Sequence, residues 1–251
     1  MIYIILPAYN EGDGVSRQIT SIESYMEQLK FPYEIIVVDD GSRDHTVSEV
    51  ERCRKSQDNI HLIRHERNFG PGMAFKSGYD YVHSKVKDRD VVITMDCDNT
   101  RSIKTLGLMI HKVQEGYEVI LGSIFTTGGM FIGVPFPRKL MTYAANFMYR
   151  VCFPIKGIRN YTGFYRAVRG SALKQAYDHY GYHFVTLKGF GCMAEILIKF
   201  RKLQMFIAEV PMIIRYDLKT SPSKLKIFET VREHVNTMLG HSLKQQSDER
   251  E

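Results

Sequence analysis

The sequence predicts an α/β fold, with a mostly parallel Rossmann-like sheet, helices on both faces and a smaller second region. Short β-branched runs alternate with segments of helical periodicity as far as about residue 122, which is the pattern of βαβ units. The chain has 251 residues, 44% of them hydrophobic, so it can bury a full core without disulfides or metal staples. Polar residues cluster just after the expected strands rather than inside them.

The first half of the chain supplies five expected strands and the helices between them. The strands are expected at residues 2–6, 34–38, 60–63, 91–95 and 118–121. Two helices show apolar spacing of three to four residues; their apolar positions are Val15, Ile19, Ile22, Met26 and Leu29 in one, and Ile103, Leu106, Ile110 and Val113 in the other.

The alternation stops after residue 122, and we expect the organisation to change there. Residues 126–137 are rich in glycine and proline, which predicts a mobile loop. Helices are expected next, at residues 138–153, 169–180 and 191–202, followed by a strand at 205–214, a helix at 223–239 and a polar end. We therefore divide the chain into residues 1–122, 123–216 and 217–251, the first two being halves of one domain.

Composition and charge limit the class of protein. A net charge of +6 favours an anionic partner, without choosing among phosphates, nucleic acid and a membrane surface. No window reaches the 18 to 20 apolar residues of a membrane span, so we expect none. The four cysteines lie far apart without a C-x-x-C pair, and no secretory leader is evident, so we expect free thiols in a reducing compartment.

Three polar clusters follow expected strands: residues 10–11, 39–42 and 96–98. The carboxyl ends of parallel strands share one edge of the sheet, where open α/β sheets bind their ligands. Each cluster alone could be a helix cap, but together they predict a site. Asp96 and Asp98 are two residues apart, so both side chains point the same way and repel unless a cation lies between them. Carboxylates with substrate phosphates are usual ligands of Mg²⁺ or Mn²⁺.

Motifs along residues 1–230 resemble the family 2 glycosyltransferases of the GT-A fold. The early motifs are Pro7-Ala8-Tyr9-Asn10-Glu11, Val37-Val38-Asp39-Asp40-Gly41-Ser42, Asn68-Phe69-Gly70 and Asp96-Cys97-Asp98. The later motifs resemble the branch of dolichol-phosphate mannosyltransferases and polyprenyl-phosphate glycosyltransferases; they are Gly128-Gly129, Arg138-Lys139, Tyr161-Thr162-Gly163-Phe164, Glu209-Val210-Pro211, and Arg215 with Ser223-Lys224. Three features depart from that branch, namely Ile124, Asn160 and the long spacing from Arg215 to Ser223.

The resemblance implies a role for each region. Residues 1–122 would bind a sugar nucleotide, residues 123–216 the acceptor, and residues 217–251 would form a C-terminal loop, helix and polar tail. The nucleoside would lie against Pro7, Tyr9, Glu11 and Asp39, supported by Asp40. Asp96 and Asp98 would bind Mg²⁺ or Mn²⁺ on the diphosphate, and Arg215, Ser223 and Lys224 would close over the phosphates.

The implied reaction is inverting transfer of a hexose, from a GDP-mannose or UDP-glucose type of donor, to a dolichyl or undecaprenyl phosphate. A phosphate monoester is already ionised at neutral pH, so this acceptor needs no general base. Basic residues should contact the acceptor phosphate, and the candidates are Arg138, Lys139 and Arg166. Glu195 lies in an apolar helical run and has two open interpretations, a residue of the acceptor site or half of a structural salt bridge.

A lipid acceptor would place the protein peripherally on the cytoplasmic face of a membrane, by its own surface or through a membrane-spanning partner. Residues 130–153 are the candidate surface, unless Leu140, Phe147 and Val151 pack on the sheet instead. Two other functions remain open: transfer to a soluble or glycan hydroxyl, which would need a base such as Glu195, and a non-catalytic nucleotide-binding module. Nucleic acid is not an expected partner, because the chain shows none of the motifs that bind it.

Overall fold

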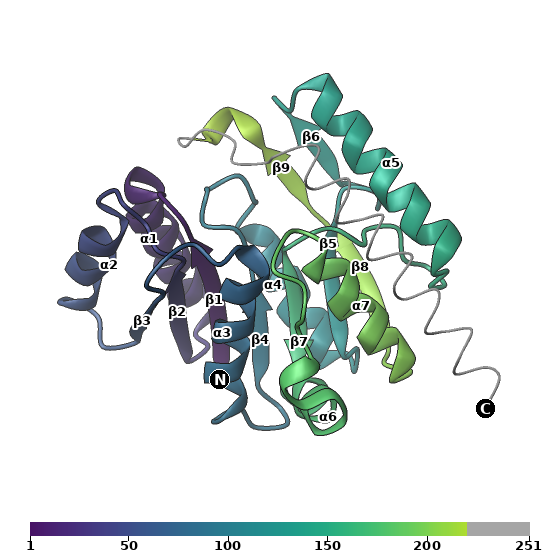
Figure 1. Ribbon diagram of the computed structural model, residues 1–251, viewed down its shortest axis with the longest axis horizontal. Coiled ribbons are helices and arrows are strands. Elements are labelled where there is room, and N and C mark those ends of the chain that lie inside the picture. Colours follow the sequence, from purple (N-terminus) through teal and green to yellow (C-terminus); the bar gives the residue numbers. More distant parts are fainter. Residues whose placement is uncertain (220–251) are drawn as a thin grey trace.

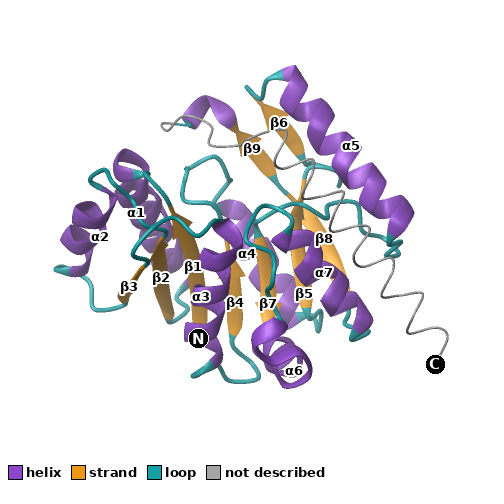
Figure 2. Cartoon of the chain, in the orientation of Figure 1, coloured by secondary structure: helices purple, strands orange, loops and turns teal. Residues whose placement is uncertain are grey.

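The computed structural model describes residues 1–219, in which seven strands form the central sheet (Figures 1 and 2). Their order across the sheet is β3-β2-β1-β4-β7-β5-β8, and β7 alone among them runs antiparallel to its neighbours. The strands are β1 (Ile2–Ala8), β2 (Tyr33–Asp39), β3 (Ile60–Arg64), β4 (Val91–Thr94), β5 (Val119–Ser123), β7 (Arg166–Arg169) and β8 (Ile207–Pro211). The mostly parallel α/β sheet predicted from the sequence is confirmed.

Alternation along the strands gives the sheet two buried faces. In β1, Tyr3 and Ile5 pack on one face, whereas Ile4 and Leu6 pack on the other. The first face is covered by α3 (Pro71–His83), α6 (Gly170–Tyr180) and α7 (Cys192–Lys202), and the second by α1 (Gly12–Leu29), α2 (Thr46–Arg54) and α4 (Lys104–Gln114). Because both faces are covered, the strands read as continuous apolar runs.

The register of the sheet aligns the strand ends that carry the polar clusters. Ala8, the last residue of β1, pairs with Asp39, the last residue of β2. On the other side of β1, the Met95 N–H donates to the Ile5 carbonyl at 3.2 Å. The chain therefore leaves three neighbouring strands at the same edge.

The second half departs from expectation in three places. Residues 126–137 contain a strand, β6 (Met130–Ile132), and residues 205–214 form two strands, because β9 (Ile213–Arg215) leaves the central sheet after Met212 and pairs with β6. Strand β7 was not predicted. This strand of four residues begins and ends with an arginine, Arg166 and Arg169, and the two apolar residues between them are too few to indicate a strand. Two short 3₁₀ helices, η1 (Gly181–His183) and η2 (Tyr216–Leu218), complete the described chain, and the expected helix at 223–239 lies outside it.

Helix α5 (Phe136–Cys152) lies apart from the central sheet, alongside β6 (Figure 1). The apolar stripe of this helix does not face the protein, because the buried residues of the helix are Asn146 and Tyr149. Leu140, Phe147 and Val151 are 57%, 60% and 64% exposed. The interpretation that these three residues pack on the sheet is therefore wrong.

Candidate functional site

The three polar clusters meet at the carboxyl edge of the sheet. The Asn10 N–H donates to Ser42 Oγ at 2.9 Å, and Asn10 Oδ1 accepts from the Arg43 N–H at 2.8 Å, which joins the first cluster to the second. The Asn99 amide donates to the Gly14 carbonyl at 2.8 Å, which joins the third cluster to the start of α1. These bonds make one site of segments that lie far apart in the sequence.

Asp39 and Asp40 follow β2 and have different surroundings, although both are buried. Asp40 accepts hydrogen bonds from the N–H groups of Phe69 and Gly70, at 2.9 and 2.8 Å, and lies 2.7 Å from His65 Nδ1. It therefore holds the 68–70 turn in place. Among residues 1–219, Asp39 accepts only long bonds, from the Ser42 N–H at 3.3 and 3.4 Å. Of the two carboxylates, Asp39 has the greater capacity left to accept from a ligand.

The turn after Asp40 requires glycine. Gly41 has φ +72°, and a Cβ built there would lie 2.3 Å from the backbone carbon of Arg67. A side chain would therefore be strained and would also clash. The close approach brings residues 40–42 against residues 67–70 at the rim of the site.

Residues after the first cluster are held by the start of α2. Thr46 Oγ1 accepts from the Glu11 N–H at 2.8 Å, and Asp44 accepts from the Gly12 N–H at 3.0 Å. Pro7, Tyr9 and Glu11 are each half-buried at this rim. The residues proposed to hold a nucleoside thus line one continuous stretch of the edge.

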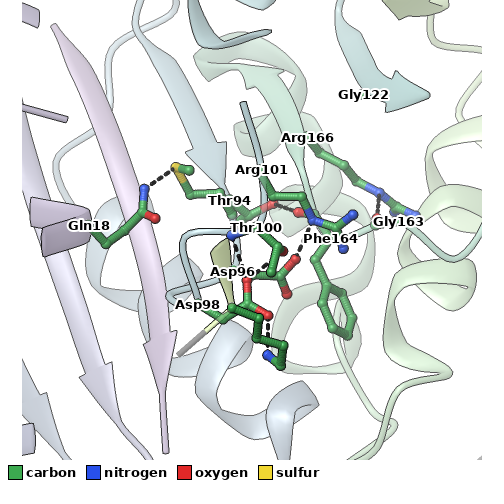
Figure 3. Close-up of polar contacts among 12 residues, drawn as sticks. Gln18, Thr94, Asp96, Asp98, Thr100, Arg101, Gly122, Gly163, Phe164 and Arg166 are labelled. Carbon is green, nitrogen blue, oxygen red and sulfur yellow. Dashed lines mark hydrogen bonds and ion pairs between the residues drawn. The ribbon is translucent and has the colours of Figure 1, made fainter. Parts of the chain in front are cut away.

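Asp96 and Asp98 lie beside each other just beyond β4, each paired with a cation (Figure 3). Arg101 Nε donates to Asp96 Oδ2 at 2.7 Å, and Lys219 Nζ donates to Asp98 Oδ2 at 2.5 Å. Asp98 Oδ1 accepts from the Thr100 hydroxyl at 2.6 Å. Sequence reasoning missed Thr100, Arg101 and Lys219, because nothing in the pattern links a lysine to a carboxylate 121 positions earlier.

The surroundings of the two carboxylates shift their pKa values in opposite directions. Burial raises the pKa of Asp96, against the attraction of Arg101. Burial also acts to raise the pKa of Asp98, but Lys219 and Arg101 together outweigh it and hold that pKa below its ordinary value. Asp98 is therefore negatively charged at neutral pH.

The donor set at this edge fits a hard divalent cation shared with a substrate. Among residues 1–219, no group of three or more histidine, cysteine, aspartate or glutamate side chains could enclose a metal ion. Two carboxylates are what Mg²⁺ or Mn²⁺ needs from a protein when diphosphate oxygens and water supply the remaining ligands. Asp96 and Asp98 are the residues that would hold it.

A strap formed by β9, η2 and Lys219, residues 213–219, crosses the acidic pair. The Arg215 N–H donates to the Thr100 carbonyl at 2.7 Å, and the Ser102 N–H donates to the Ile213 carbonyl at 3.2 Å. The Arg215 guanidinium forms a bidentate pair with Asp217, at 2.7 and 2.9 Å. Arg215 is thus near the site with its charge engaged by Asp217, and its expected partners Ser223 and Lys224 lie outside the described residues.

The start of α5 reaches the same region through Tyr216. Arg138 lies over the Tyr216 ring at 5.1 Å, and Lys219 lies 5.8 Å from the same ring. Lys139 is half-buried on the first turn of α5. Of the three candidates for an acceptor phosphate, Arg138 therefore shares a tyrosine ring with Lys219, the lysine that contacts Asp98.

Arg166 is placed differently from the expectation. Its side chain is fully buried and donates to the Gly163 carbonyl at 2.9 Å (Figure 3). It also donates to the carbonyls of Met193 and Tyr161 at 2.5 and 2.6 Å. Burial lowers its pKa to about 10, so it stays charged at neutral pH. The three carbonyls engage the guanidinium, so Arg166 supports the 161–163 turn from within the core.

Glu195 has the surroundings of a structural ion pair, one of its two open interpretations. It is 1% exposed and contacts Lys199 Nζ at 2.6 Å. It also accepts from the N–H groups of Thr186 and Leu187, each at 3.0 Å, and from the Thr186 hydroxyl at 2.5 Å. The carboxylate joins α7 to the loop before it.

Two asparagines that sequence reasoning did not single out as supports hold the Tyr161-Thr162-Gly163 turn. Asn146 of α5 accepts from the Tyr161 N–H at 2.6 Å and donates to the Thr162 hydroxyl at 3.1 Å. Asn160, one of the three departures from the family branch, donates to the Gly122 carbonyl at 2.5 Å, a bond that requires a side-chain N–H group. The turn is thus tied to both α5 and β5.

Comparison with solved structures shows the same fold. Glucosyl-3-phosphoglycerate synthase from Mycobacterium tuberculosis, solved with Mn²⁺, uridine diphosphate and phosphoglyceric acid, matches with a TM-score of 0.67 over 96% of this chain and 78% of that one. The same enzyme with Mg²⁺ and uridine diphosphate matches with a TM-score of 0.66, over 96% and 78% of the two chains. Sequence identity is 17% in both cases, so the comparison establishes the GT-A fold alone.

Two curated relatives match across most of the chain, and a third matches across about half of it. The chain is 28% identical to the dolichol-phosphate mannosyltransferase of Pyrococcus furiosus, over 95% of this chain and 63% of that protein. It is 27% identical to the polyprenol monophosphomannose synthase of Mycolicibacterium smegmatis, over 72% of this chain and 68% of that protein. An uncharacterised glycosyltransferase of Synechocystis is 32% identical, over 47% of this chain and 35% of that protein. The chain thus spans about a third of the length of the Synechocystis protein and under two thirds of the length of the Pyrococcus protein.

The family comparison covers the whole first half and the turn at residues 161–163. Residues 3–177, well over half of the chain, match the family described as Glycosyl transferase family 2. The matched stretch holds the three polar clusters and the acidic pair. The chain therefore belongs to glycosyl transferase family 2.

Proposed function

We propose that the protein transfers a hexose, with inversion, from a sugar nucleotide to a polyprenyl phosphate. The observation that carries the donor half of this proposal is the acidic pair Asp96 and Asp98, which shares one sheet edge with residues 9–11 and 39–42. Family membership and the names of the Pyrococcus and Mycolicibacterium relatives support the same reaction.

In this proposal residues 1–122 bind the sugar nucleotide. Asp39 accepts from the base or the ribose, because its carboxylate keeps capacity that Asp40 has used on the 68–70 turn. Pro7, Tyr9 and Glu11 line the same rim. A Mg²⁺ or Mn²⁺ ion on Asp96 and Asp98 would neutralise charge on the diphosphate. Arg215, with Ser223 and Lys224, would add positive charge on the departing group.

Residues 123–216 would position the acceptor phosphate. One of its oxygens forms a bond to the anomeric carbon while the bond from that carbon to the diphosphate breaks, and the nucleoside diphosphate leaves with the electron pair. Because the attacking oxygen is already ionised, no side chain need remove a proton. The burial of Glu195 in an ion pair agrees with a reaction that needs no base. Arg138 and Lys139 are the proposed contacts to the acceptor phosphate.

A lipid acceptor requires the site to approach a bilayer, and the exposed side of α5 is the proposed contact. In the described part of the chain, no helix has the length and apolar character needed to cross a membrane. The exposed apolar residues of α5 are Phe136, Leu140, Tyr143, Phe147, Met148 and Val151. Arg138, Lys139 and Arg150 could meet anionic headgroups, and such a helix binds reversibly in the interface plane.

Transfer to a soluble acceptor is the second candidate, and one observation favours it. The solved structures with the same fold include an enzyme crystallised with phosphoglyceric acid. The exposed apolar side of α5 argues for the lipid, since nothing about a small anionic acceptor calls for it.

Radiolabelled sugar nucleotides test the reaction directly. The protein is incubated with labelled GDP-mannose or UDP-glucose, with a polyprenyl phosphate or phosphoglyceric acid as acceptor, and the label is partitioned into organic solvent. We expect the label to become organic-soluble only when the acceptor is the polyprenyl phosphate. Adding EDTA should abolish this transfer, and adding Mn²⁺ should restore it. Label that stays aqueous would refute the lipid acceptor, and full activity in EDTA would refute the metal.

Flotation on anionic liposomes tests the membrane contact. Phe147→Ser with Val151→Ser should release the protein from vesicles and reduce transfer to lipid. Phe206→Ser is the matched control. Phe206 is 70% exposed, but it comes directly before the first residue of β8, at the amino end of the strand and away from the carboxyl edge that carries the candidate site. Equal flotation of the wild type and both variants would show that α5 is not the contact.

A further inference from the structure

Within the described residues, the acidic pair carries its own counter-cations, and these two cations differ. Arg101 lies on the same loop as Asp96 and Asp98, five residues after the first of them. Lys219 belongs to the strap, 121 positions after Asp98. One cation is part of the loop, whereas the other comes to it from a separate segment.

Lys219 contacts Oδ2 of Asp98, the carboxylate oxygen that Thr100 does not contact. The Thr100 hydroxyl holds Oδ1, and Lys219 Nζ donates to Oδ2. The lysine and the aspartate side chains are 11% and 17% exposed, so solvent screens the pair poorly. An ammonium 2.5 Å from Oδ2 and a divalent ion about 2.1 Å from it would lie less than about 5 Å apart, where their positive charges repel each other.

Charge balance indicates when the lysine can leave. Asp96, Asp98, Arg101 and Lys219 are balanced among themselves, so a divalent ion added alone leaves excess positive charge in a half-buried site. The diphosphate of a sugar nucleotide brings one negative charge for each phosphate, which restores the balance. It also offers the displaced ammonium a new anionic partner.

We propose that Lys219 makes metal binding conditional on the sugar nucleotide. Without the nucleotide, Lys219 stays on Asp98 and keeps divalent ions weakly bound. When metal and nucleotide arrive together, Lys219 moves from Asp98 to the diphosphate. The inference rests on the proposed donor site, and it assigns to Lys219 a specificity role that Asp96 and Asp98 alone would not have.

Mn²⁺ binding, followed by the electron paramagnetic resonance signal of the free ion, tests this without measuring turnover. The ion is titrated with and without UDP or GDP into the wild type and Lys219→Gln, which keeps a hydrogen-bond donor but loses the charge. We expect the variant to bind Mn²⁺ alone more tightly, by a factor within the roughly 5- to 150-fold range of typical coupling, and the gain from nucleotide to shrink by the same factor.

Two further variants separate charge from simple disturbance. Lys219→Arg keeps the charge and should keep Mn²⁺ binding weak without nucleotide. Lys174→Gln is the matched control, because Lys174 pairs with Asp88 at 2.7 Å on the surface of α6 and should bind Mn²⁺ as the wild type does. Thermal melting of each variant shows that the folded protein is being compared.

The outcomes separate this inference from the proposed function. If nucleotide strengthens Mn²⁺ binding equally in the wild type and Lys219→Gln, the role of Lys219 is refuted and the donor site stands. If Mn²⁺ does not bind the wild type even with UDP or GDP, the donor site is refuted and the inference falls with it.

Discussion

Two carboxylates, the buried Glu195 in α7 and the half-buried Asp98 after β4, are each paired with a lysine, yet their surroundings differ. Glu195 receives Lys199, the Thr186 hydroxyl and two backbone N–H groups, and Lys199 also donates to the carbonyls of His183 and Phe184. Asp98 receives Thr100 from its own loop and Lys219 from the strap. One pair is enclosed by the core, and the other lies at the sheet edge under a separate segment.

This comparison distinguishes a carboxylate that stabilises the fold from one that binds a ligand, which residue type alone does not do. A buried ion pair whose atoms are all hydrogen-bonded joins the elements around it, and breaking it costs stability. A carboxylate whose counter-cation comes from a peripheral segment can exchange that cation for a ligand. Substitutions in the first kind of site should lower the melting temperature, whereas substitutions in the second kind should weaken ligand binding and slow turnover.

Replacing Asp98 should produce the largest functional effect. Asp98→Asn removes the charge that would hold a metal ion on the diphosphate, so transfer should fall by roughly 10²- to 10³-fold or more. The melting temperature should change little, because the asparagine can still bond Thr100. Asp96→Asn should behave alike. Activity within a few-fold of the wild type, measured by the labelled-sugar assay, would break the comparison.

Replacing Glu195 should have the opposite profile. Glu195→Ala leaves Lys199 buried without its carboxylate, at a cost of about 3–5 kcal/mol. At about 2–4 °C for each kcal/mol in a domain of this size, the melting temperature should drop by roughly 10 °C.

The rate of the folded fraction tells which acceptor is used. With a phosphate acceptor, Glu195→Gln should keep the rate within a few-fold. A hydroxyl acceptor served by Glu195 as base would instead lose about 10²- to 10⁴-fold in rate, with little change in melting.

The sequence was sufficient for the parallel part of the sheet and insufficient for what lies around it. The first five strands are short β-branched runs, and β1, β2 and β4 each end in a polar cluster, so the strand positions and the edge shared by these three followed directly. Strand β7 was missed because a buried arginine begins it, and only three backbone carbonyls folded around Arg166 make that residue compatible with the core.

The sequence predicted which carboxylates lie at the candidate site but not which residues contact them. Asp39, Asp40, Asp96 and Asp98 come directly after strands, a local signal, whereas Lys219 depends on a fold that returns the chain to β4. The side of α5 that faces solvent could not be read from spacing either. An apolar stripe has the same period whether it is buried or exposed, and here Asn146 and Tyr149 take the buried side.

Asp39 and Asp40 extend the comparison to the donor side, with smaller expected effects. Asp39→Asn should weaken binding of UDP or GDP by about 10- to 100-fold, the range of a hydrogen bond to a charged group, and leave the rate at saturation nearly unchanged. Asp40→Asn should instead lower the melting temperature, because His65 and the 68–70 turn lose their shared acceptor. Calorimetry that shows equal nucleotide affinity for Asp39→Asn and the wild type would remove the donor role of Asp39.

The smallest effect is expected where a lysine–aspartate pair has neither burial nor a ligand to exchange. Lys174 and Asp88 lie 2.7 Å apart, with side chains 45% and 69% exposed. Water solvates both groups when the pair is broken, so Lys174→Ala should change neither the melting temperature nor Mn²⁺ binding measurably. Lys199→Ala should destabilise the fold, and Lys219→Ala should alter metal binding. If Lys174→Ala matched either of them, the surroundings of a lysine–carboxylate pair would not decide its role in this protein.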